Sequence, residues 1–115
     1  MNELRAKNVV SYTFTTKGNK KRTCRVLVED LQEEELQDCE FIPLQDALQD
    51  FGFEKNGSNF YCKRSGYFVQ WSSLPQLKGL LKIKNKEKDD ILHLHGVMFL
   101  HQLQNVYKVF TGEDL

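Results

Sequence analysis

The stretch from Pro43 to Lys84, PLQDALQDFGFEKNGSNFYCKRSGYFVQWSSLPQLKGLLKIK, decides the fold class of this chain. Its first part has apolar residues at helical spacing, with Pro43 in the first turn and Gly52 just past the end. The apolar positions are Leu44, Ala47, Leu48 and Phe51. The spacing predicts an amphipathic helix over residues 43–51, with Asp46 and Asp50 facing water.

The middle of the stretch contains three short runs with strand composition, at residues 53–55, 60–63 and 67–71. Tight turns at residues 56–58 and 64–66 separate them. After these strands, the spacing of Ser73 and Gln76 is that of a capping box, which predicts a second helix starting at Ser73. Its apolar face would be Leu74, Leu77, Leu80 and Leu81, and its outward face with the following exit would carry Lys78, Lys82, Lys84, Lys86 and Lys88.

On the N-terminal side, residues 8–16 and 22–28 alternate in the manner of strands around a polar break, which predicts a β-hairpin. Residues 29–39 have helix-forming composition with few apolar anchors, so a surface helix or partly a loop is expected. Residues 91–110 begin as a strand with Leu92 and Leu94 on one side and His93 and His95 on the other. Their second half fits a helix or a strand.

These elements predict an α+β fold with an antiparallel sheet of about five to seven short strands and two or three helices. We expect residues 1–115 to form one domain. Its parts would be the hairpin at 8–28, the helix, three strands and helix at 43–84, and the C-terminal strand with a strand or helix at 91–110.

Composition places the chain in the ordinary globular class, because 40% of its residues are apolar and 28% are charged. The longest uncharged apolar stretch, around Ile91 to Leu100, is too short for a membrane-spanning helix. The N-terminus lacks the apolar core of a secretory signal, so a cytoplasmic location without membrane contact is expected. The three cysteines, Cys24, Cys39 and Cys62, match neither a disulfide framework nor a zinc site, and reduced thiols are expected.

Charge is strongly segregated although the formal sum is zero. Residues 1–25 carry seven Lys and Arg against one Glu, whereas residues 27–54 carry ten acidic residues and no basic one. Residues 55–88 are again basic, with eight Lys and Arg against one Glu, and the remaining tail is acidic. Neutrality is therefore a cancellation between opposite fields, which points to binding through charged surfaces.

The basic segments predict nucleic-acid binding if they share a face, because lysines there would neutralise phosphates. Aromatic residues of the three central strands could stack on unpaired bases if they are exposed. Those aromatic residues are Phe60, Tyr61, Tyr67, Phe68 and Trp71. The candidate nucleic-acid-binding residues are Lys17, Lys20, Lys21, Arg22, Lys78, Lys82, Lys84 and Lys86.

The predicted order of helix, three strands and helix resembles double-stranded-RNA-binding domains and the small toxin nucleases of the HicA type. The segment LQDALQDFGFEKNGSNFYCK carries the second resemblance. Asn59 stands where the resemblance implies a catalytic histidine, and an amide cannot act as a general base. The resemblance therefore implies binding without cleavage.

The triplet His93-Leu94-His95 with Tyr107 resembles the HUH motif of rolling-circle replication initiators and relaxases. The side chains of residues two positions apart on a strand point the same way, so both imidazoles could hold one divalent metal ion. The resemblance implies that Tyr107 attacks a DNA phosphate. A metal-dependent nickase is the enzymatic alternative, and no other cofactor is expected.

The acidic stretch supports a third interpretation, in which the protein inhibits or regulates a nucleic-acid enzyme by occupying its basic cleft. The candidate protein-binding residues are Glu29, Asp30, Glu33, Glu34, Glu35 and Asp38. Gly-rich phosphate loops and nucleophile elbows are absent from the sequence, so a non-catalytic module is favoured. The leading hypothesis is a small nucleic-acid-binding protein, monomeric or homodimeric, with a nucleic acid or a nucleic-acid-processing protein as its partner.

Overall fold

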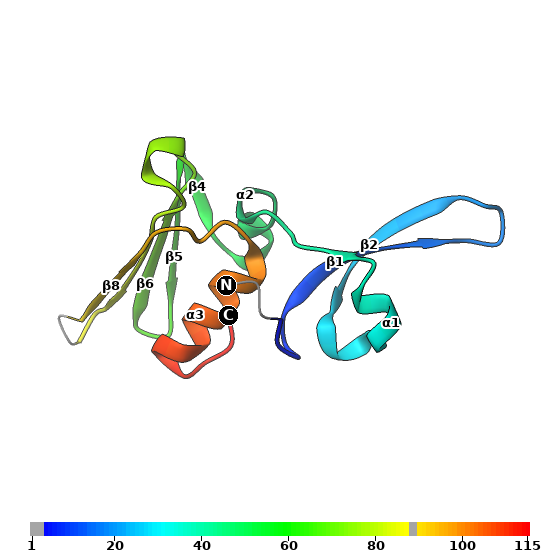
Figure 1. Cartoon of the computed structure of the whole chain (residues 1–115). Coiled ribbons are helices and arrows are strands. Elements are labelled where there is room, and N and C mark those ends of the chain that lie inside the picture. Colours follow the sequence, from blue (N-terminus) through cyan, green and yellow to red (C-terminus); the bar gives the residue numbers. More distant parts are fainter. Residues whose placement is uncertain (1–3, 88–89) are drawn as a thin grey trace.

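The computed structural model describes residues 4–87 and 90–115, and it confirms the α+β class with antiparallel strands. The described strands form two sheets instead of one: a three-stranded sheet of order β2-β1-β3 and a five-stranded sheet of order β4-β5-β6-β7-β8 (Figure 1). The strands are β1 Val9–Thr15, β2 Lys21–Leu27, β3 Cys39–Glu40, β4 Glu54–Asn56, β5 Asn59–Arg64, β6 Tyr67–Ser72, β7 Leu81–Asn85 and β8 Ile91–Leu94.

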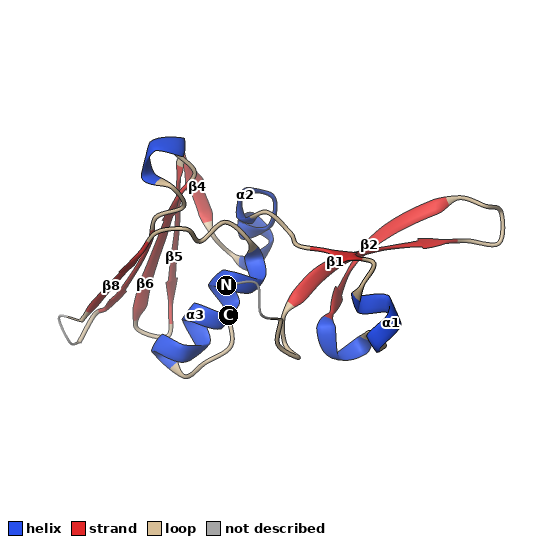
Figure 2. Ribbon diagram, in the orientation of Figure 1, coloured by secondary structure: helices blue, strands red, loops and turns tan. Residues whose placement is uncertain are grey.

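Most of the helices are short (Figure 2). The α-helices are α1 Glu33–Leu36, α2 Leu44–Ala47 and α3 Leu100–Thr111, and the single-turn 3-10 helices are η1 Val28–Asp30, η2 Leu48–Phe51 and η3 Pro75–Leu77. In the described part of the chain, no helix has the length and apolar character needed to cross a bilayer.

The predicted N-terminal hairpin is confirmed, with β1 and β2 paired over their full length from Val9 opposite Leu27 to Thr15 opposite Lys21. Figure 1 shows the hairpin extending away from the five-stranded sheet, with its tip at the far end of the molecule. The segment predicted as a surface helix or partly a loop forms η1 and α1. Gln32 and Glu35 close a capping box at the start of α1.

The amphipathic helix predicted over residues 43–51 is present as α2 followed by η2. Leu44, Ala47 and Leu48 are fully buried, as their spacing predicts. Gly52 ends the helix in the left-handed conformation with φ of 85°. The helical half of the ambiguous C-terminal segment is α3, which lies on the same side of the five-stranded sheet as α2 (Figure 1).

The second predicted helix is wrong. Only η3 forms, and the residues expected on its last turns build strand β7. Lys78 and Gly79 both have left-handed backbones, with φ of 49° and 68°, which ends the helix after one turn. Ser73 does not cap it, because its N–H and hydroxyl both donate to the Ser58 carbonyl oxygen, at 2.8 and 3.0 Å.

The main core lies between the five-stranded sheet and the helices. Phe60, Val69, Trp71, Leu81 and Ile83 supply the sheet side. Leu100, Leu103 and Tyr107 of α3, together with the apolar face of α2 and η2, supply the other. Burial of these side chains holds the helices to one face of the sheet and leaves the opposite face uncovered by any described helix (Figure 1).

Side-chain contacts attach the three-stranded sheet to this core. Asn8 Nδ2 donates to Asn105 Oδ1 of α3 at 2.8 Å, and the Val9 N–H donates to Gln104 Oε1 at 3.0 Å. On the neighbouring strand, Arg25 pairs with Asp50 and donates to the Asp46 carbonyl oxygen at 2.9 Å. Both strands of the hairpin are therefore fastened at their base, and the outer half is exposed.

Candidate nucleic-acid interface

The uncovered face of the five-stranded sheet, called the open face below, is defined by strand register. Directly paired residues of an antiparallel sheet share a face. Lys63 pairs with Phe68, which pairs with Lys84, and Lys82 pairs with His93. The open face comprises Glu54, Asn56, Asn59, Tyr61, Lys63, Phe68, Gln70, Lys82, Lys84, Ile91 and His93, together with Ser72, which is buried.

Two aromatic rings lie next to each other on this face. The ring centroids of Tyr61 and Phe68 are 5.9 Å apart with an interplanar angle of 34°, and both side chains are partly exposed. A shallow cavity of about 450 Å³ adjoins them, lined by Gly52, Glu54, Tyr61, Cys62, Lys63 and Phe68. Partly exposed rings in this position offer a flat apolar surface on which a nucleobase or another planar group could stack.

Three lysines border the aromatic pair. Lys63 and Lys84 are exposed and Lys82 is half-buried. Within residues 4–87 and 90–115, none of the three takes part in an ion pair. Their charges are therefore available to an anionic ligand, and Glu54 at the β4 edge is the acidic side chain on the same face.

The other aromatic residues of these strands do not reach the open face. Phe60 and Trp71 are buried in the core, and the Trp71 indole donates to the Val97 carbonyl oxygen at 2.7 Å. Tyr67 lies on the inner face with its ring 6.4 Å from that of Tyr107. The five aromatic candidates are thus divided by strand alternation, and two of them lie where a base could stack.

The eight basic residues proposed from the sequence do not form one surface. Lys82 and Lys84 lie on the open face, whereas the exposed tip residues occupy the far end of the hairpin (Figure 1). The tip residues are Lys17, Lys20, Lys21 and Arg22. Lys78 follows η3, and Lys86 follows β7 with its N–H donated to the Gly66 carbonyl oxygen at 3.0 Å. Lys88, which the predicted helix exit included, lies outside the described residues.

The acidic candidates surround the base of the hairpin. Glu29 forms an ion pair with Lys7 at 3.0 Å, and the Glu35 carboxylate accepts the Gln32 N–H at 2.9 Å. Glu33 and Glu34 are exposed on α1, which Figure 1 places beside the hairpin. Asp30 is the last residue of η1 and Asp38 follows α1, and both are exposed. Acidic and basic candidates thus lie on different elements.

The structure does not bring Tyr107 to the histidines. His93 is exposed on the open face, whereas Tyr107 is fully buried on the other side of the sheet, where burial raises the pKa of its hydroxyl. His95 follows the end of β8, and its Nδ1 lies 3.0 Å from the Leu77 carbonyl oxygen. Among the described residues, no three His, Cys, Asp or Glu side chains are placed to share a metal ion.

His101 is fully buried in the first turn of α3. Its ring packs against those of Phe41 and Phe99, with centroid distances of 4.4 and 6.0 Å. Neither ring nitrogen has a hydrogen-bond partner in the described structure. Burial lowers the pKa of this imidazole, so the neutral form is favoured.

The three cysteines are free, as predicted, and each lies on a strand. Burial raises the pKa of the Cys39 and Cys62 thiols, which keeps them protonated and poorly nucleophilic. Cys24, in the middle of β2, is exposed.

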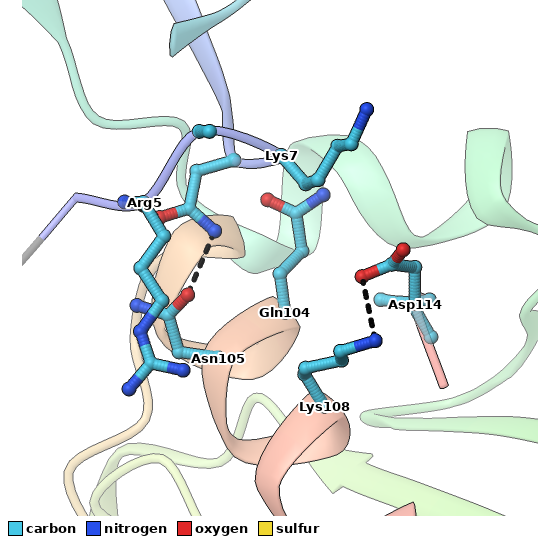
Figure 3. Close-up of a pocket in the computed structure, with 9 residues that line it drawn as sticks. Arg5, Lys7, Gln104, Asn105, Lys108 and Asp114 are labelled. Carbon is cyan, nitrogen blue, oxygen red and sulfur yellow. Dashed lines mark hydrogen bonds and ion pairs between the residues drawn. The ribbon is translucent and has the colours of Figure 1, made fainter. Parts of the chain in front are cut away.

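A cleft of about 260 Å³ marks the junction between the N-terminal segment and α3. Figure 3 shows Arg5 and Lys7 on one side and Gln104, Asn105 and Lys108 on the other. Lys108 Nζ lies 3.8 Å from Asp114 Oδ1. Because its amides are engaged in the hydrogen bonds that join the two sheets, this cleft is a structural joint, and the open face remains the better candidate.

No protein-family model, curated protein or solved structure matches this chain. The resemblances to HicA-type nucleases, double-stranded-RNA-binding domains and HUH proteins therefore gain no support from these comparisons. The order of helix, three strands and helix that suggested the first two is also broken, because η3 and β7 replace the second helix.

Proposed function

We propose that the protein is a non-catalytic module that binds single-stranded nucleic acid across the open face. The observation that supports this most directly is the Tyr61–Phe68 pair, partly exposed and bordered by Lys63, Lys82 and Lys84 on a sheet face without a covering helix.

This combination matches the chemistry of an unpaired strand. Flat aromatic rings stack on bases of any sequence, and each stacked base contributes about 1–3 kcal/mol. Lysines beside the rings would neutralise the phosphates between successive bases. A duplex hides its base faces, so it would use the lysines but not the rings. The open face therefore favours single strands.

Salt dependence and ring chemistry give separate tests of the proposal. Binding of a fluorescent 20-nucleotide oligothymidine is measured by anisotropy over a series of NaCl concentrations. The double variant Lys82→Gln/Lys84→Gln should make the negative slope of log K against log salt shallower by about 1.4, because each lost phosphate contact contributes about 0.7 to its magnitude. Phe68→Leu keeps the bulk of the side chain and should weaken binding about 5- to 150-fold without changing the slope.

The hairpin tip offers a matched control. Lys20→Gln/Lys21→Gln also removes two positive charges, but at the far end of the molecule. We expect the tip variant to keep most of the affinity. An equal loss in both double variants would mean that bulk charge drives binding, and no anisotropy change for the wild type at low salt would remove the proposal altogether.

A second candidate function is inhibition of a nucleic-acid enzyme through the acidic side chains of α1. It is favoured by the exposure of Glu33 and Glu34, which have no ion pair in the described part of the chain. Such a surface would imitate phosphates in a basic cleft. A wild type that ignores the oligonucleotide but competes with it for a basic nucleic-acid enzyme, with competition lost in Glu33→Lys/Glu34→Lys, would favour this candidate.

A further inference from the structure

Strand β8 is an edge of the five-stranded sheet, and no described strand pairs with its outer side. Its residues, Ile91 to Leu94, carry no formal charge and no proline. The opposite edge, β4, is only three residues long and includes Glu54 and Lys55. Proteins usually shield edge strands with charges, proline or short length, because an open edge pairs with other strands. β8 is one residue longer than β4 and lacks its charged side chains, so it is the more open of the two edges.

The hydrogen-bonding groups of β8 are directed in a way that permits this pairing. The Asn85 N–H donates to the Asp90 carbonyl oxygen at 3.2 Å, in the same register that pairs Ile83 with Leu92. Even-numbered residues therefore face β7, and the N–H and C=O groups of Ile91 and His93 face outward. An added strand could bond to them without disturbing the existing sheet.

An apolar groove runs beside this edge on the α3 side of the sheet. Its cavity of about 410 Å³ is lined mainly by Leu92, Leu94, Val106, Val109 and Phe110, and Arg5 also lines it. Val109 is 73% exposed, more than Ile91 or Met98. A strand paired with β8 would direct alternate side chains into this groove.

We propose that the occupant is a second copy of this chain, paired antiparallel through β8 about a two-fold axis centred on His93. In this register, Leu92 of each copy lies opposite Leu94 of the other, on the groove side of the sheet. Shifting the axis to Leu92 would place Asp90 opposite Leu94, which is unfavourable for a carboxylate. Self-pairing through an isologous interface is the commonest way in which soluble chains dimerise.

Charge complementarity supports the same register. Asp90 precedes β8 with the orientation of Leu92 and Leu94, so its exposed carboxylate would extend past Leu94 of the second copy. Arg5 lies there, since it lines the groove together with Leu94 and a neighbouring cavity that reaches Gly96. Figure 3 shows the Arg5 side chain beside Asn105 and away from Lys108 and Asp114. Neither Arg5 nor Asp90 has an ion pair within the described residues, and the dimer would form two.

The test is the mass in solution, measured by sedimentation over a concentration series. The wild type should reach twice the 13.5 kDa of one chain. Arg5→Asp or Asp90→Arg should weaken dimerisation at least about 100-fold, because each change places like charges together at two symmetric points. The double variant Arg5→Asp/Asp90→Arg should restore the dimer to within about tenfold of the wild type.

Backbone pairing is tested separately. His93→Pro removes an outward N–H that no bond of the sheet uses, so it should abolish the dimer and leave the circular dichroism spectrum unchanged, whereas His93→Ala should dimerise. A monomeric wild type at every concentration would overturn the proposal, as would a charge-swapped double variant that stays monomeric. Because the measurement is mass, the result does not depend on nucleic-acid binding.

Discussion

Among the seven glycines, Gly79 is the one whose replacement by alanine should destabilise this fold most. It has φ of 68°, and a Cβ placed on it would lie 2.6 Å from the Val97 carbonyl oxygen and 3.0 Å from the Val97 nitrogen. That backbone cannot move aside freely. The carbonyl oxygen accepts the Trp71 indole N–H, and the nitrogen donates to the Gly79 carbonyl oxygen at 3.1 Å.

The expected cost of Gly79→Ala has two parts. A left-handed alanine costs about 1–2 kcal/mol. Forcing atoms into a packed site costs about 1–3 kcal/mol more, as overpacked cores do. We therefore expect a loss of about 2–5 kcal/mol in the free energy of unfolding, a large share of the stability of a small domain.

Gly96→Ala is the matched control, because Gly96 has φ of 85° and nothing within 4 Å of the added Cβ. It should lose the conformational part alone, about 1–2 kcal/mol. Urea denaturation of both variants, with m-values compared to the wild type, measures the difference. If Gly79→Ala costs no more than Gly96→Ala, the contact with Val97 does not constrain the fold and the reasoning is wrong.

Two further predictions concern buried polar side chains. Burial lowers the pKa of His101 in the folded state, so the unfolded chain binds the proton more readily. The free energy of unfolding should therefore fall as pH drops below about 6.5. For this one group the fall is at most about 1.4 kcal/mol per pH unit. His101→Leu should flatten that part of the curve in urea titrations at pH 7 and pH 5, and an unchanged slope would assign the effect to other groups. Asn8→Ala should cost about 1–3 kcal/mol, since Asn8 is 2% exposed, accepts the Arg5 N–H and donates to Asn105. Asn56→Ala, at the exposed end of strand β4, is the comparison and should cost clearly less.

Sequence patterns predicted the elements whose signal is local. The hairpin at residues 8–28 and the helix at 43–51 were predicted because alternation, Pro43 and Gly52 act within a few residues. The helix from Ser73 was wrong because Leu77, Leu80 and Leu81 also have helical spacing. The alternation of Leu81 and Ile83 with Lys82 and Lys84 is that of a strand. Pairing with β6 and β8, which are distant in sequence, decides in favour of the strand.

The candidate site was predictable only in part for a related reason. Composition identified lysines and aromatic residues as the relevant groups, and Tyr61 and Phe68 were among them. Which of those rings faces solvent depends on where α2 and α3 pack, and that is set by contacts distant in sequence. His101 shows the same limit, because its burial arises from Phe41, sixty residues earlier in the chain.

The projecting hairpin tip has a practical consequence. A Cβ added to Gly18 would have no atom within 4 Å. The two strands that lead to this turn are paired with each other from Thr15 and Lys21 to the base of the hairpin. An epitope or fluorescent tag inserted between Gly18 and Asn19 would therefore extend into solvent without disturbing the pairing of β1 and β2. The molecule carries its own attachment point for immobilisation, far from the open face and from β8.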